Sequence, residues 1–193
     1  SCEPQRAYKI MDLKKIEKLA KLLLREIGEA VDREGLKKTP QRIAKSYEKI
    51  FGGYNKNPKD LITTFDGENY DEMIICKQID FYSTCEHHLQ PFFGTVSIGY
   101  IPGKKIIGIS KLPRLVEIFS RRLQNQERLT MQIAESLNEL LKPKGVGVVL
   151  KAKHLCMMAR GVEKQNTVMI TSSCTGLFKN NAKTRSEFLK LIN

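Results

Sequence analysis

The stretch Ser83-Thr84-Cys85-Glu86-His87-His88 closes a predicted strand with a cluster of thiol and imidazole side chains. Apolar residues alternate from about residue 73 to residue 81, which predicts a half-buried strand that runs into this cluster. All three histidines of the chain lie either here or in a second segment, Lys153-His154-Leu155-Cys156. We therefore predict a fold that brings the two segments together around a metal ion.

The spacing within the two segments indicates which residues could bind the metal. Cys85 and His88 are three residues apart, so a turn can direct both at one ion. His154 and Cys156 are two apart and would share one face of a strand. An ion held by Cys85, His88 and Cys156 would have three protein ligands, which is typical of catalytic zinc, and His87 and His154 would remain for proton transfer. The alternatives are a structural zinc site that includes His154, or buried thiols and imidazoles without a metal.

Length and composition favour a globular protein outside membranes. The chain has 193 residues, 41% of them hydrophobic and 28% charged, which suits one domain with a sizeable core. No apolar run approaches the roughly 18 residues that span a bilayer, and the start of the sequence lacks the apolar core of a signal peptide. We expect a cytoplasmic protein whose five cysteines are thiols or metal ligands rather than disulfides.

The formal net charge of +12 allows three kinds of partner or surface: nucleic acid, an anionic small molecule, or a solvated lysine-rich face. Much of the excess lies in the first predicted helix, where a solvated face is the simplest explanation. Aromatic residues are not interleaved with these lysines. Because single-stranded nucleic acids are bound by such aromatic residues, nucleic acid is not the expected partner.

The first seventy residues predict an arm, two helices and a loop. Residues 1–10 show no periodicity, and we expect a flexible arm there. Apolar residues keep helical spacing from Asp12, the predicted N-cap, to about Arg33. Thr39 as N-cap and Pro40 as first residue indicate a second helix, which the glycines at 52 and 53 end.

The remainder predicts strands with helices between them. In the strand expected at 146–157 the even positions are apolar and lead to His154 and Cys156, so both should point inward. A capping box at Thr184 and Glu187 opens the last helix. The whole indicates an α+β fold with an antiparallel sheet backed by helices and an N-terminal helical extension. The other strands are expected at about 73–85, 92–101, 105–109 and 167–173, and helices at about 111–123 and 127–141.

Two pairs of basic residues are spaced so that each could bind an anion. Arg42 and Lys45 share a face of the second helix. Lys111 and Arg114 lie at the start of the helix that follows Ser110, its predicted N-cap, where free backbone N–H groups favour anions. Solvated surface charges would explain either pair without a ligand.

Longer motifs surround these residues, and they occur in a characteristic order: 39–45, 85–88, 107–114, 124–130, 154–162 and 176–189. Together they resemble the signature segments of the GTP cyclohydrolase I family over about residue 12 to the C-terminus. The resemblance implies the tunnelling fold, with a catalytic domain at 71–193 after a helical region at 11–70. It also implies a decamer of two facing pentameric rings, with active sites between subunits.

The activity implied by the resemblance is zinc-dependent hydrolysis of the guanine imidazole ring of GTP. Formate is released, and 7,8-dihydroneopterin triphosphate is formed as the first step of pterin and folate biosynthesis. Zinc is assigned to Cys85, His88 and Cys156, as spacing also favours. The remaining roles implied are proton transfer by His87 and His154, ribose rearrangement with Ser110, guanine binding by Glu127 with Gln126 beside it, and triphosphate binding by Lys111, Arg114 and Arg160 with Arg42 and Lys45 of a neighbouring subunit.

Two other functions remain open at this point. Another pterin or purine enzyme of the tunnelling-fold group would share the architecture, but the synthase of that group uses an all-histidine zinc site, unlike the cysteines here. A basic zinc-stabilised RNA-binding module is allowed by charge alone. It would bind with steep salt dependence and would have no use for Glu127.

Overall fold

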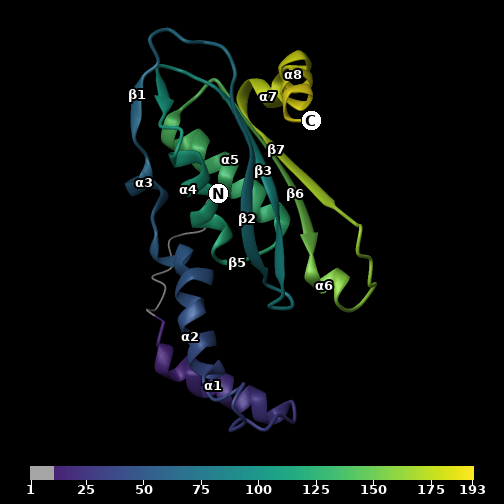
Figure 1. Ribbon diagram of the computed structural model, residues 1–193. Helices are drawn as coiled ribbons and strands as arrows, with labels where there is room; N and C mark the ends of the chain where they lie inside the picture. The colour runs from purple at the N-terminus through teal and green to yellow at the C-terminus, as the bar shows by residue number, and fades with distance from the viewer. Residues whose placement is uncertain (1–10) are drawn as a thin grey trace.

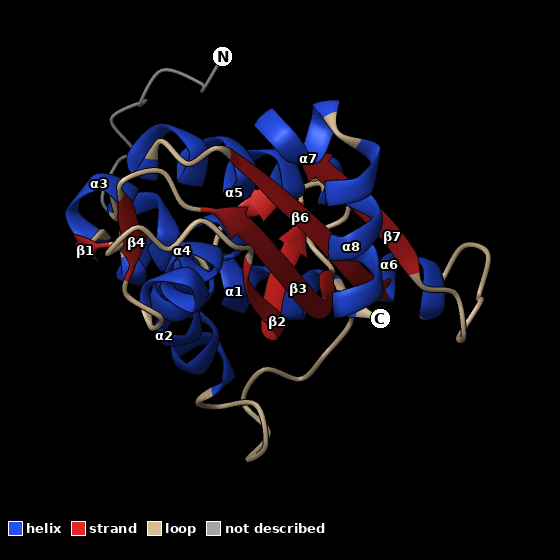
Figure 2. Cartoon of the chain, turned by 90° about the horizontal axis from the view of Figure 1, so that it is seen from above, coloured by secondary structure: helices blue, strands red, loops and turns tan. Residues whose placement is uncertain are grey.

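Alternating apolar residues along the chain form one five-stranded sheet, which helices cover on both faces (Figures 1 and 2). The computed structural model describes residues 11–193, so the arm expected at 1–10 lies outside the described residues. Neighbouring strands are antiparallel, except that the two-residue β5 runs parallel to β2. The order across the sheet is β5 (Leu123–Gln124), β2 (Ile74–Cys85), β3 (Pro91–Ile101), β6 (Gly145–His154) and β7 (Met169–Cys174).

The strand register brings the two predicted metal segments to the same end of the sheet. Ser83 of β2 is paired with Phe92 of β3, and Phe92 is in turn paired with His154 of β6. Cys85, two residues beyond Ser83, therefore lies close to the end of β6. A bulge between Cys76 and Ile79 interrupts the pairing of β2 with β3.

Helices α4 (Lys111–Ser120) and α5 (Gln126–Leu141) cover one face of the sheet and enclose the larger core. Val146, Val148 and Leu150 of β6 are fully buried there, which confirms the inward direction predicted for the even positions. Burial of such side chains contributes on the order of 2 kcal/mol each. The same core includes Leu115, Leu129, Ile133 and Leu137 from the two helices.

Helices α7 (Gly176–Asn180) and α8 (Ala182–Ile192) cover the opposite face with a smaller core. Phe178 and Phe188 are fully buried, and their rings pack edge to face with centroids 5.3 Å apart. Both rings lie over Gly99 and Gly147, which are directly paired in β3 and β6. A Cβ at Gly147 would come within 2.4 Å of the Phe178 ring, so only glycine leaves room for this packing.

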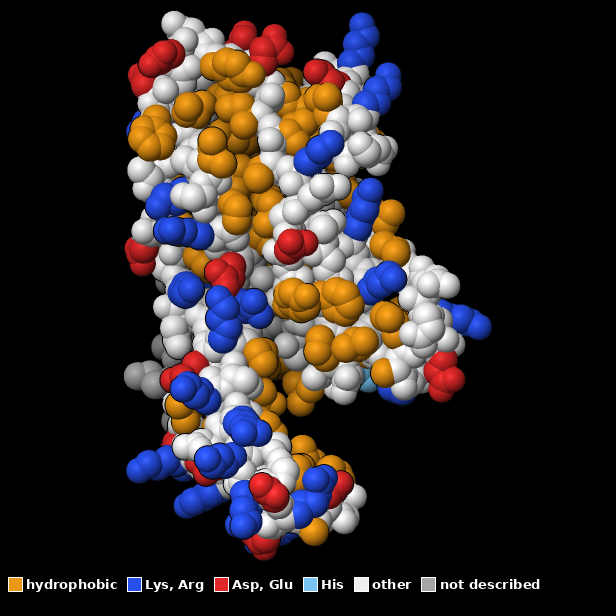
Figure 3. All heavy atoms as spheres, viewed as in Figure 1, with side chains coloured by type: hydrophobic (Ala, Val, Ile, Leu, Met, Phe, Trp, Pro, Cys, Tyr) orange, Lys and Arg blue, Asp and Glu red, His pale blue; other side chains and the backbone are white. Residues whose placement is uncertain are grey.

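The N-terminal helices α1 (Leu13–Glu26) and α2 (Thr39–Ile50) form a pair that projects away from the sheet (Figure 1). Lys and Arg side chains are spread over this pair in the space-filling view (Figure 3). Three short elements lie between this pair and β2: η1 (Gly52–Asn55), α3 (Pro58–Leu61) and β1 (Thr64–Asp66). Strand β1 forms a separate two-stranded antiparallel sheet with β4 (Lys105–Ile107).

Several boundaries differ from those predicted. Helix α1 begins after the predicted N-cap Asp12 but ends at Glu26 instead of near Arg33, because Gly28 adopts a positive φ of 90° that turns the chain. The N-cap position of α2 is Lys38 rather than Thr39, whose hydroxyl instead donates to the carbonyl of Gly35.

Two further differences concern the C-terminal half. Asn181, not Thr184, caps α8, since the Asn181 side chain accepts from the N–H groups of Lys183 and Thr184. Strand β6 ends at His154, and α6 (Leu155–Met158) follows at once. The expectation that Cys156 lies on the same strand face as His154 is therefore wrong, because the intervening backbone turns into a helix.

None of the helices within residues 11–193 combines the length and the apolar character required to cross a bilayer.

Candidate metal centre and active site

A tight turn at the end of β2 presents the first cluster. The Cys85 N–H donates to the carbonyl of Gln90 at 2.8 Å, and the Leu89 N–H donates to the carbonyl of Cys85 at 2.9 Å. Leu89 has a positive φ of 52°, which reverses the chain toward β3. The Glu86 N–H donates to the carbonyl of Gln124, so β5 supports the turn from the other side. Backbone hydrogen bonds therefore hold the segment from Cys85 to Gln90 in one turn.

Three of the predicted ligands converge in the space between this turn and α6. The donor atoms of Cys85, His88 and Cys156 all lie within 4.8 Å of one another. Both cysteines are buried, whereas His88 is exposed on the outer side. Sγ of Cys85 lies 3.6 Å from Nδ1 of His88. The structure thus brings together the three residues that spacing favoured, although Cys156 arrives on a helix rather than a strand.

The chemistry of this donor set suits a metal cation. Burial raises the pKa of the Cys156 thiol, and the neighbouring sulfur of Cys85 raises it further. Two thiolates so close together repel each other in a partly dry environment, and a bound cation would remove that repulsion. Soft sulfur ligands combined with an imidazole select ions such as zinc over magnesium or calcium. The three residues could therefore hold a soft divalent metal.

His87 lies next to the metal-binding set but is not part of it. Its side chain is 64% exposed, and Nε2 lies 3.7 Å from Oε1 of Glu86. Nδ1 lies 3.9 Å from the sulfur of Cys85, farther than the corresponding atom of His88. Among the described residues, the group of potential metal ligands includes His88 and not His87.

Glu86 anchors the turn to α5, and the sequence reasoning did not assign it a role. Its carboxylate accepts hydrogen bonds from the guanidinium of Arg128 and, at 3.2 Å, from the side-chain amide of Asn125. The Arg128 hydrogen bond lowers the pKa of Glu86, more than its partial burial raises it. Asn125 also caps α5 by accepting from the Arg128 N–H. The sequence signal that could have indicated this ion pair was an acidic residue, Glu86, inside the 85–88 motif and a basic residue, Arg128, inside the 124–130 motif.

His154 lies beside the metal-binding set but outside it. Its ring stacks on Phe92, with centroids 4.6 Å apart and planes 3° from parallel. Nε2 lies 2.7 Å from Oε1 of Gln126. Burial lowers the pKa of His154, and the negative charge of Glu127 opposes part of that effect. Burial therefore favours the neutral imidazole, the form that can accept a proton.

The predicted substrate-binding residues of the main body lie on three elements, of which α5 and the segment after α6 are at the metal-binding end. The start of α4 lies beside the other end of the sheet, because the N–H of Ile107, just before it, donates to the hydroxyl of Tyr100, which is paired with Ile74 at the start of β2. Glu127 is exposed in the first turn of α5. Ser110 occupies the predicted N-cap position of α4 but its side chain makes no capping hydrogen bond. Lys111 and Arg114 follow in the first turn of α4. Arg160 is exposed just after α6, and Nη1 donates to the carbonyl of Cys156 at 3.5 Å.

Arg42 and Lys45 are both exposed on α2, in the helical pair that projects from the body. Figure 1 shows α2 well separated from α6 and from the turn between β2 and β3. The chain therefore does not bring this pair to its own metal-binding set.

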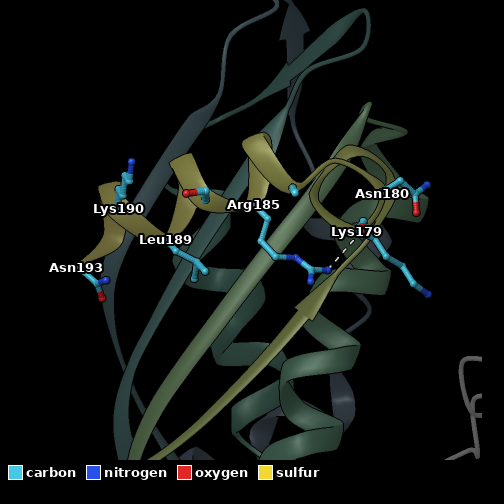
Figure 4. A pocket seen from close by; sticks show the side chains of 8 residues that line it. Lys179, Asn180, Arg185, Leu189, Lys190 and Asn193 are labelled. Carbon is cyan, nitrogen blue, oxygen red and sulfur yellow. Dashed lines mark hydrogen bonds between the residues drawn. The ribbon is translucent and has the colours of Figure 1, made fainter.

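A pocket on the other side of the molecule contains none of the candidate residues. It lies against α7 and α8, where Arg185 donates to the carbonyls of Phe178 and Lys179 and ties the two helices together (Figure 4). Its contacts serve the packing of the C-terminal helices.

Comparison with known proteins places these observations in a family. The sequence model described as GTP cyclohydrolase I matches residues 16–193, which is nearly the whole chain. The chain belongs to the GTP cyclohydrolase I family. This confirms the resemblance found in the sequence motifs, and with it the prediction that the chain is a hydrolase of this kind.

Similar curated proteins share both the name and most of the length. GTP cyclohydrolase 1 of Wolinella succinogenes is 56% identical over 84% of this chain and 88% of its own. The protein of the same name from Leptospira biflexa is 55% identical over 92% of this chain and 97% of its own. The one from Campylobacter jejuni strain RM1221 is 52% identical over 93% of this chain and 95% of its own. Family membership therefore extends over both the N-terminal helices and the sheet.

Proposed function

We propose that the metal-binding set at the end of β2 is the centre at which this member of the GTP cyclohydrolase I family opens the guanine imidazole ring of GTP. The products are formate and 7,8-dihydroneopterin triphosphate, a precursor of pterins and folate. The observation that carries the proposal is the convergence of Cys85, His88 and Cys156 beside two histidines outside the set.

Zinc is the metal that this donor set fits best. Two thiolates and one imidazole are common zinc ligands, and a set of three protein ligands is typical of catalytic zinc. Zinc, when bound, supplies a water molecule whose pKa is lowered to about 7 for hydrolysis.

The two remaining histidines would handle protons on opposite sides of the reaction. His87 is exposed and close to the metal ligands, so it can reach the purine and donate a proton to N7, which makes C8 more electrophilic. His154 is half-buried, which lowers its pKa and favours the neutral ring, so it can accept a hydrogen bond or a proton from the ribose. Ser110, with no capping bond to occupy its hydroxyl, would take part in the later rearrangement of the ribose.

Substrate binding would be divided between the base and the triphosphate. The exposed carboxylate of Glu127 would accept hydrogen bonds from N1–H and the 2-amino group of guanine, a readout that rejects bases without those donors. Lys111 and Arg114 would bind phosphate oxygens at the start of α4, where the helix dipole also favours anions. Arg160 would close the site from the segment after α6.

The assembly proposed for this chain is the tunnelling fold, built into a decamer of two pentameric rings. The separation of Arg42 and Lys45 from the chain's own metal-binding set supports shared sites, since both residues would then reach the triphosphate bound by a neighbouring subunit. The proposal also keeps the division into a helical region at 11–70 and a catalytic domain at 71–193.

The test is to incubate the purified, zinc-loaded protein with GTP, and to measure formate together with a fluorescent pterin after oxidation. Protein treated with a chelator should lose the activity and regain it when zinc is added back. ATP, which lacks the donors that Glu127 would read, should yield no formate. If the zinc-loaded protein produced neither formate nor pterin from GTP, the proposed function would be wrong.

A further inference from the structure

Gln126 is a buried amide whose orientation is fixed by its neighbours. It is the first residue of α5 and only 3% exposed. Its Nε2 atom donates to the carbonyls of Leu150 and Met169, at 3.3 and 3.0 Å, and to the hydroxyl of Thr171 at 3.1 Å. Backbone carbonyls can only accept hydrogen bonds. The nitrogen must therefore face β6 and β7, and the oxygen must face the other way.

A chain of hydroxyl groups leads to the same orientation independently. The hydroxyl of Thr130 lies 2.7 Å from the backbone carbonyl of Gln126 and 2.7 Å from the hydroxyl of Thr171. Because the carbonyl only accepts, Thr130 donates to it and accepts from Thr171. Thr171 has then used its proton, so it accepts from Nε2 of Gln126. The two hydroxyl protons of the circuit therefore have one consistent arrangement, and it requires the amide nitrogen to face Thr171.

The orientation of Gln126 determines where His154 carries its proton. Oε1 of Gln126 lies 2.7 Å from Nε2 of His154, and an amide oxygen only accepts. Nε2 of His154 must therefore be the protonated nitrogen of the neutral ring, which leaves Nδ1 unprotonated. Stacking on Phe92 fixes the plane of the ring. The tautomer and the orientation are thus both set before any substrate arrives.

We propose that Gln126 is a positioning residue, which holds His154 with its proton on Nε2 and presents Nδ1 to the substrate as a hydrogen-bond acceptor. An unprotonated imidazole nitrogen accepts from a hydroxyl group, the group that the ribose of GTP offers. The assignment rests on the proposed function for the identity of the substrate. It differs from the sequence expectation that Gln126 contacts guanine beside Glu127, since the amide nitrogen is already bonded to β6 and β7 and the amide oxygen lies against His154.

The first test is spectroscopic and needs no turnover. The sequence has only three histidines, so ¹⁵N-histidine labelling of the zinc-loaded assembly gives three rings to assign, with His154→Gln identifying one of them. We expect a directly bonded proton on Nε2 of His154 and none on Nδ1 at a pH where the ring is neutral. A proton on Nδ1 in the wild-type protein would overturn the assignment by itself.

The second test separates positioning from substrate contact. Gln126→Met keeps the volume but removes the acceptor, so kcat should fall about 10- to 100-fold while KM for GTP changes less than about threefold. The bonded signal of the His154 Nε2 proton should be lost in this variant. A rise in KM with unchanged kcat would instead assign Gln126 to substrate contact, against the proposal.

Two variants serve as comparisons. Gln132→Met removes another amide from α5, one that accepts from Gln124, and should leave kcat and the His154 spectrum as in the wild type. Thr171→Val removes one acceptor from the circuit while both carbonyls remain, so kcat should fall less than with Gln126→Met. If Gln126→Met failed to fold, the histidine spectrum of the wild type and the kcat of Thr171→Val would still test the proposal. An inactive protein with the expected spectrum would contradict the proposed function and leave the tautomer assignment intact.

Discussion

At the residue scale, three histidines of one chain receive three different environments. His88 lies with two cysteines, His87 is mostly exposed, and His154 is stacked and half-buried. Two neighbouring residues in the sequence therefore have different environments: the turn after Cys85 brings His88 into the metal-binding set and leaves His87 exposed beside it.

A pair of substitutions tests this division of roles. Cys156→Ala removes one thiolate ligand, so bound zinc and turnover should be lost together. His87→Ala should retain the zinc, because His87 lies outside the ligand set, while kcat falls about 100-fold or more through loss of the general acid. Zinc content by atomic absorption and the rate of formate release check both. Zinc loss from His87→Ala would show that the ligand and the acid have been exchanged.

At the element scale, the packing of the C-terminal helices depends on two glycines that face each other across β3 and β6. Gly147→Ala places a methyl group within 2.4 Å of the Phe178 ring, in a core with no space to spare. Such overpacking costs about 1–3 kcal/mol, so the melting temperature should fall by several degrees. Gly52→Ala is the control, because a Cβ there meets nothing within 4 Å and should leave the melting temperature nearly unchanged. Equal melting temperatures for the two variants would argue against the packing described.

The contact between α2 and α4 should depend on pH. Lys49 donates to the carboxylate of Glu117, and this hydrogen bond lowers the pKa of Glu117, with Lys56 and Arg121 adding to the effect. A lowered pKa in the folded state means that the stabilisation is present above the pKa of the unfolded chain and is lost as pH falls through the folded value.

Glu117→Gln should therefore reduce the free energy of unfolding at pH 7 by no more than about 1 kcal/mol, since the pair is partly exposed. The difference from the wild type should shrink as the pH falls below about 4. Urea titrations of both proteins at pH 7 and at a pH below about 4 measure this difference in the free energy of unfolding. A difference that is equal at both would show that the ionised pair does not stabilise the contact.

At the scale of the whole molecule, the helical pair α1 and α2 projects from the body and lies apart from the metal-binding set of its own chain. If Arg42 acts on a neighbouring subunit's site, mixed assemblies should recover activity that neither parent has. Co-expression of Arg42→Ala with His87→Ala should restore about a quarter of the sites, because a random mixture pairs an intact α2 with an intact catalytic end that often. Formate release by the co-purified assemblies measures the recovery.

The matched control combines two defects from the same end of one chain. Cys156→Ala mixed with His87→Ala should recover nothing, because both residues belong to the same metal-binding region of each subunit. Absence of recovery in the Arg42 mixture as well, or a monomer in sedimentation, would contradict sites shared between subunits.

The sequence by itself determined the α+β class, the inward face of β6, and the three residues that converge as potential metal ligands. These follow from local signals: periodicity fixes which side of a strand is buried, and few combinations of cysteine and histidine spacing suit one ion. The family also follows from the sequence, because its motifs are long and ordered.

Only the tertiary structure decided which partners the polar groups have. That Arg128 holds Glu86, and that Gln126 turns its oxygen toward His154, depends on α5 meeting β6, β7 and the turn after β2 across long separations in the chain. Helix ends were also decided by hydrogen bonds rather than by periodicity, as with Asn181 and with the turn at Gly28. Local patterns record burial, but the direction of a hydrogen bond depends on which distant acceptor lies opposite each donor.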